Sequence, residues 1–142
     1  MRDLRVCLLA VVAIGCGGKD SGELDDDDAL GGPSSGVTDG GTFSVEYETE
    51  PSPIPVSEDF IVRTRVTDTR GVWIDDATVV VDADMPTHDH GMNTIPTTTF
   101  VGDGWYETTG MLFHMPGPWQ ITIDITAEGV YETAVLPYEC CF

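Results

Sequence analysis

The chain has 142 residues and a formal net charge of −19, with 25 acidic and only 6 basic side chains. This length suits one domain with a short appendage. Binding to nucleic-acid phosphates, or electrostatic docking on anionic lipid, needs clustered lysine and arginine, and the sequence has no such cluster. Nucleic-acid binding and charge-driven membrane docking are therefore excluded.

The N-terminal residues 1–15 have the pattern of a bacterial lipoprotein signal peptide. Two arginines precede an apolar run, residues 6–14, that is too short to span a bilayer. Small residues lead into Cys16 as in a lipobox, although Ala13 stands where leucine is usual. We expect Cys16 to carry the lipid, so that acyl chains hold the protein to the cell envelope. Gly17 after it favours the outer membrane over the inner one.

Residues 16–41 are rich in glycine, serine and aspartate and poor in apolar residues. Such a composition buries too little surface to offset chain entropy, so it predicts a flexible acidic linker. The run Asp25-Asp26-Asp27-Asp28 lacks the alternating ligands and central glycine of a calcium loop. We interpret it as a solvated charge run.

From Thr42 the texture changes to short segments in which apolar and polar residues alternate, with proline, glycine and aspartate between them. The alternating segments cover residues 43–47, 60–66, 79–83, 106–108, 119–125 and 130–136. Period two predicts strands, and no helical period is present. Residues 42–142 are thus expected to form an all-β domain, an immunoglobulin-like antiparallel β-sandwich of about seven strands.

The segment MPTHDHGM, residues 85–92, holds two of the three histidines of the chain. If it is extended, His88, His90 and Met92 point to the same side, because strand side chains alternate. Pro86 places the segment near a strand end. Met85 then faces away, unless Pro86 bends the chain.

The third histidine, His114, lies beside Met115 and just before a Pro-Gly-Pro turn. A sandwich gathers its loops at two ends, so His114 can meet His88 and His90 at one rim. Imidazole suits copper and zinc, whereas thioether sulfur prefers Cu(I). We therefore predict a copper site formed by His88, His90, His114, Met92 and Met115, with Cu(I) favoured over Cu(II).

Two acidic side chains, Asp84 and Asp89, could orient an imidazole from behind the ligands of this site. The alternative is that these residues are ordinary scaffold. Methionine fills irregular cores well, and His90 before a glycine is a common turn residue. The sequence leaves both readings open.

Two further cysteines, Cys140 and Cys141, are adjacent near the C-terminus. A disulfide between neighbours is strained, because disulfide geometry prefers Cα atoms further apart. A metal-binding thiol pair and an intermolecular link also remain open. We favour a strained disulfide or a chain end without a function.

The two histidine segments together resemble the YtkA-like domain, an immunoglobulin-like module of exported and membrane proteins in bacteria. The resemblance covers residues 43–136. Its first motif is matched by Met85, Pro86, His88, His90, Gly91 and Met92. Its second motif is matched by Gly104, Tyr106, Phe113, Met115, Pro116, Gly117 and Trp119. Relatives with the extra histidine resemble copper-handling envelope proteins, so the resemblance implies a β-sandwich that binds copper.

An enzyme is not expected. Both C-terminal cysteines follow all the histidines, which disfavours a blue-copper centre, and no nucleophile motif is present. The predicted function is copper buffering or delivery to a recipient protein of the envelope. The alternative is an interaction or structural module of the cell envelope, in which Trp73, Trp105 and the strand edges contact another protein.

Overall fold

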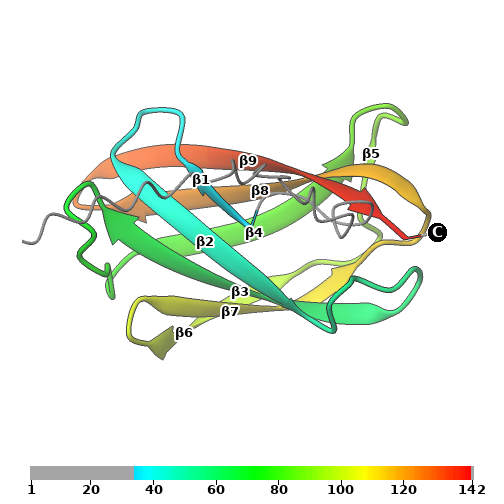
Figure 1. Ribbon diagram of the computed structural model, residues 1–142, viewed down its shortest axis with the longest axis horizontal. Helices are drawn as coiled ribbons and strands as arrows, with labels where there is room; N and C mark the ends of the chain where they lie inside the picture. The colour runs from blue at the N-terminus through cyan, green and yellow to red at the C-terminus, as the bar shows by residue number, and fades with distance from the viewer. Residues whose placement is uncertain (1–33, 142) are drawn as a thin grey trace, which may run out of the picture.

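The computed structural model describes residues 34–141, and these form two antiparallel β-sheets packed face to face (Figure 1). The predicted signal peptide, Cys16 and most of the predicted linker lie outside the described residues. Within 34–141 no helix is present that could cross a membrane. The strands are β1 (Ser35–Val37), β2 (Phe43–Glu50), β3 (Asp59–Asp68), β4 (Thr78–Met85), β5 (His90–Gly91), β6 (Thr97–Gly102), β7 (Trp105–Leu112), β8 (Gly117–Ala127) and β9 (Val130–Cys140). The predicted all-β sandwich is confirmed.

One sheet has five strands in the order β1-β2-β3-β7-β6, and the other has four in the order β5-β4-β8-β9. Neighbouring strands are antiparallel throughout, and the pairs β1–β2, β6–β7 and β8–β9 are joined by short turns. The four-stranded sheet therefore places β5 and β9 at its opposite edges, about 14 Å apart if each strand spacing is about 4.8 Å.

The core lies between the sheets because each long strand turns every second residue inward. Strand β8 shows this best: Ile121, Ile123 and Ile125 are fully buried, whereas the residues between them are half-buried. In β3 the residues Val62 and Val66 are equally buried. Removing this apolar surface from water is the main driving force for the fold.

Three strands were not predicted. Strand β1 falls inside residues 16–41, so the folded domain begins before the expected start at Thr42. Its glycine and serine give no period-two signal, and it is held by pairing with β2 and by the hydrogen bonds of buried Thr38. Strand β6 is a largely exposed edge with no buried residue, and β5 has two residues only. Alternation cannot reveal such strands.

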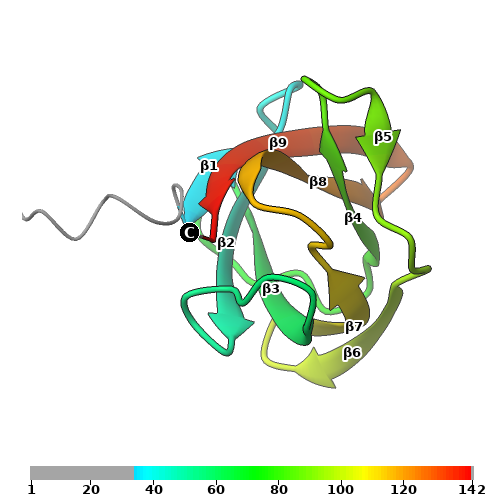
Figure 2. The ribbon, with the colours of Figure 1, turned by 90° about the vertical axis from the view of Figure 1, so that its right-hand side faces the viewer.

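One end of the sandwich gathers the parts that carry the histidines. The turn between β4 and β5, the link between β7 and β8 and the C-terminal end of β9 all lie at this end, which faces the viewer in Figure 2. We call it the histidine end. The opposite end holds the turn between β8 and β9.

Candidate metal centre

His88 lies in the turn before β5, and His90 is the first residue of β5. Residues 86–89 form a turn in which the His88 amide donates to the Met85 carbonyl (3.0 Å), and Asp89 has a φ of 55°. His90 then pairs with Met85 across β4 and β5. The segment is therefore not extended as the same-face argument assumed, because the chain reverses between the two histidines.

The His90 ring nevertheless lies near the rings of both other histidines. The ring centroids of His88 and His90 lie 5.7 Å apart, and those of His90 and His114 lie 4.9 Å apart. Two imidazoles that share one ion, with metal–nitrogen bonds of about 2.0–2.1 Å, have centroids roughly 5 Å apart. The predicted meeting of the two motifs at one rim is confirmed.

His114 is positioned by the link between β7 and β8. Beside it, buried Phe113 stacks on Trp119 with centroids 4.3 Å apart and an angle of 8°. The Trp119 indole N–H donates to the Met115 carbonyl (3.0 Å). On the other side, the Ser57 amide donates to the Phe113 carbonyl (2.7 Å) and its hydroxyl to the His114 carbonyl (3.3 Å). The backbone of His114 is thus fixed from two sides.

The ring nitrogens that could bind an ion follow from the hydrogen bonds. His90 Nδ1 lies 3.2 Å from the Gly91 carbonyl, which only accepts, so Nδ1 carries the proton and Nε2 keeps a free lone pair. His114 Nδ1 is buried and has no hydrogen-bond partner. A buried polar atom without a partner is costly, and such atoms call for an explanation such as an ion.

The methionines divide into two groups. Met85 and Met111 are fully buried in the core and act as scaffold. Met92 and Met115 are only partly buried and pack against the edge of that core. The Met92 sulfur accepts a hydrogen bond from the amide of Leu112 (3.4 Å), the last residue of β7, which is two residues before His114 in the chain. Both partly buried thioethers belong to the histidine end.

The structure also shows what the site lacks. Within residues 34–141, no three histidine, cysteine, aspartate or glutamate side chains are grouped so that they could hold a metal ion. His88 is exposed on its turn, whereas His90 and His114 are partly buried, so His88 lies at the solvent-facing opening, or mouth, of the candidate site. Asp84 lies in β4 opposite Gly91 and Gln120. A site here needs thioether ligands or a movement of His88.

Trp119 was not predicted as part of the site. Its ring lies edge-on to His90 (6.1 Å) and to His114 (5.5 Å), and it is 1% exposed. In sequence it reads as one more inward residue of an alternating strand. The signal that could have identified it is its position five residues after His114, beyond a Pro-Gly-Pro turn that folds the chain back. Trp119 thus forms the buried apolar surface beneath the rings of His90 and His114.

Comparison with known families gives one match. A family model described as YtkA-like matches residues 39–124. The matched range includes all three histidines, Met92, Met115 and Trp119, but leaves out the whole of β9 and both C-terminal cysteines. No curated protein and no solved structure matches the chain.

Proposed function

The chain belongs to the YtkA-like family, and we propose that it is a lipid-anchored envelope protein that binds copper as cargo. His90 and His114 supply two imidazoles, His88 covers the mouth, and Met92 or Met115 completes the site. Lipidation of Cys16 would hold the domain near a membrane, most simply the outer one. The protein is not proposed to be an enzyme; it buffers copper or delivers it to another envelope protein.

The observation that carries this proposal is the unpartnered, buried Nδ1 of His114 beside the ring of His90. A histidine placed only for packing would pair or expose both ring nitrogens. Imidazole nitrogen and thioether sulfur together favour copper, and sulfur favours Cu(I) over Cu(II). The acidity of the chain adds to this, since a net charge of −19 enriches cations near the surface.

Titration of the purified chain with Cu(I) and Cu(II) tests the proposal, with zinc as the comparison metal. We expect one copper ion per chain, and X-ray absorption should show both nitrogen and sulfur ligands. His114→Ala should weaken copper binding at least 100-fold, whereas His88→Ala, at the exposed mouth, should weaken it less. A chain that binds no copper, or an unchanged affinity in His114→Ala, would reject the proposal.

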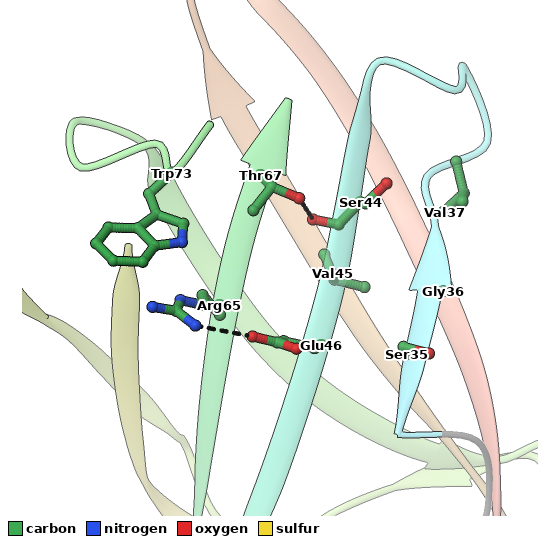
Figure 3. Close-up of a pocket in the computed structure, with 9 residues that line it drawn as sticks. All are labelled: Ser35, Gly36, Val37, Ser44, Val45, Glu46, Arg65, Thr67 and Trp73. Atoms are coloured by element: carbon green, nitrogen blue, oxygen red, sulfur yellow. Dashed lines mark hydrogen bonds and ion pairs between the residues drawn. The ribbon is translucent and has the colours of Figure 1, made fainter. Parts of the chain in front are cut away.

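A second function is supported by a separate surface. Trp73 is 49% exposed and lies beside a cavity of about 350 Å³ on the five-stranded sheet (Figure 3). The Arg65 guanidinium lies over the rings of Trp73 (4.2 Å) and Trp105 (5.0 Å) and pairs with Glu46 (3.3 Å). Exposed tryptophan and arginine are enriched in protein interfaces, so this surface favours the interaction-module alternative.

The two functions are separable by experiment. Trp73→Ala should leave copper binding unchanged, because none of its contacts involves a histidine. It should abolish capture of an envelope partner only if the interaction alternative is correct. Loss of partner capture together with a chain that binds no copper would favour that alternative over the copper proposal.

A further inference from the structure

The C-terminal end of β9 holds a disulfide between Cys140 and Cys141. In a regular strand these neighbours would point to opposite faces. Here both are buried, at 0% and 9% exposed, because Cys141 adopts a φ of 58° that non-glycine residues rarely occupy. The chain end is therefore shaped to bring the two sulfurs together inside the protein.

Two short connections link this pair to the backbone of His114. Cys140 lies opposite Gly117 across β8 and β9, and Gly117 is three residues from His114, at most about 11 Å along the chain. On the other side the Cys141 sulfur lies 3.2 Å from the Ile54 carbonyl. Ile54 belongs to the loop whose Ser57 donates to the carbonyls of Phe113 and His114.

An aromatic series fills the space between these connections. Trp119 stacks on Phe113, and the Phe113 ring lies 5.9 Å from that of Tyr138, which is two residues before Cys140. The Tyr138 hydroxyl accepts from the Ile54 amide (3.1 Å). Phe113, Trp119 and Tyr138 are all buried, so packed side chains lead from the cysteine pair to the histidines.

From this arrangement we infer that the reduced cysteine pair supplies electrons to Cu(II) bound at the histidine site, which rests on the proposed function. Cys140 and Cys141 lose two electrons and two protons and form one S–S bond. Two Cu(II) ions that occupy the site in turn each take one electron and leave as Cu(I). The pair is returned to the dithiol by exchange with an external dithiol, which attacks Cys141, the more exposed of the two sulfurs.

Two properties favour the pair as the donor. Disulfides of neighbouring residues are strained, and strained disulfides are the ones that cycle between oxidised and reduced forms rather than staying fixed. Cys140 and Cys141 are also largely buried, and the packed rings of Tyr138, Phe113 and Trp119 lead from them to the histidines, which favours electron transfer through the histidine site. Thioether ligands stabilise Cu(I), so the ligands of the site and the electrons of the cysteine pair both favour reduction of Cu(II) to Cu(I).

The test uses the full chain with Cys7→Ser and Cys16→Ser as the background of every variant, so that Cys140 and Cys141 are its only thiols. It is reduced with a dithiol that is then removed without air. Cu(II) is added, its electron paramagnetic resonance signal is followed, and the C-terminal peptide is alkylated and weighed. The peptide readout shows whether the electrons come from Cys140 and Cys141. We expect the wild type to lose the signal of two Cu(II) per chain while this peptide gains its disulfide. Cys140→Ser with Cys141→Ser should bind Cu(II) equally well and keep the signal.

Two further variants separate the possible outcomes. His90→Ala with His114→Ala should keep its C-terminal thiols after Cu(II) is added. Cys141→Ser alone, which tests against misfolding of the double serine variant, should reduce no more than one Cu(II). Copper reduction in the double serine variant, or thiol oxidation at the wild-type rate without the histidines, would overturn the inference. If the chain with Cys140 and Cys141 intact binds no copper, the proposed function fails as well.

Discussion

The two ends of the sandwich treat their buried polar groups in opposite ways. At the end away from the histidines, Glu132 is 8% exposed and accepts hydrogen bonds from the Thr38 hydroxyl, the Thr42 hydroxyl and the Thr42 amide (3.0 Å). At the histidine end, Nδ1 of His114 has no partner. Strand β9 connects the two ends, since it starts near Glu132 and finishes at Cys140 (Figure 1).

The difference separates stability from binding. A fully bonded carboxylate closes the turn between β1 and β2 against β9 and leaves nothing for a ligand. An unsatisfied imidazole costs stability but remains free to bind an ion. Variants at the histidine end should therefore change metal affinity, and variants at the Glu132 end should change stability alone.

The largest effect is expected from removing both inner imidazoles. His90→Ala with His114→Ala should abolish measurable copper binding, because a thioether and an exposed histidine cannot hold the ion alone. Glu132→Gln is the matched control at the other end and should leave the dissociation constant unchanged. Isothermal titration of both variants makes the comparison. Equal loss of affinity in both would mean that the ends are not independent.

A smaller effect is expected at the bonded end. Thr38→Val keeps the shape of the side chain but removes the donor to Glu132 and the acceptor for the Phe43 amide (3.1 Å). Leaving buried groups unpaired should lower the free energy of unfolding by about 1–3 kcal/mol. Urea unfolding followed by circular dichroism measures it. A Thr38→Val chain as stable as the wild type would show that these hydrogen bonds do not stabilise the fold.

At the histidine end the thioether should discriminate between copper oxidation states. Met92→Leu should weaken Cu(I) about tenfold and Cu(II) much less, because sulfur prefers the softer ion. Met111→Leu, in the core, is the control and should change neither affinity, because Met111 is fully buried. Competition with a colorimetric Cu(I) chelator provides the measurement. If Met92→Leu leaves Cu(I) affinity unchanged, Met115 becomes the sulfur ligand to test.

Most of the fold could be predicted from the sequence because period-two alternation states directly which residues face a core. Strand β8 is the clearest case, with its buried isoleucines spaced by two. Strands β1 and β6 could not be predicted in this way. Neither alternates between buried apolar and exposed polar residues, and each is held at a sheet edge by pairing with the strand that follows it.

The candidate site was predicted by residue type and only partly by geometry. The approach of the His88/His90 segment to His114 was expected and is present, with His90 near both other rings. The reversal of the chain at residues 86–89 was not expected, because Pro86 alone does not specify a turn. Trp119 was missed as well, since its contact with the histidines depends on how the Pro-Gly-Pro link folds back.

The finest test of the comparison is the pH dependence of the Glu132 end. The hydrogen bond from Thr38, followed by that from Thr42, lowers the pKa of the Glu132 carboxyl below its ordinary value of 4.5. A group whose pKa is lower in the folded state stabilises the protein above its unfolded pKa and loses that contribution as the pH falls through the folded pKa. The stabilisation that ionised Glu132 gives to the fold is thus present above about pH 4.5 and is lost progressively as the pH falls below that value.

Thermal unfolding of the wild type and of Glu132→Gln at a series of pH values between 7 and 3 measures this contribution. The wild type should melt at a higher temperature at neutral pH, and the difference should shrink as the carboxyl becomes protonated and resembles the amide. Other carboxylates titrate in both proteins, so only the difference between the two curves reports on Glu132. A difference that stays constant down to pH 3 would mean that the amide is poorly accommodated for steric reasons. In that case hydrogen bonding to a charged carboxylate would not be what distinguishes this end from the histidine end.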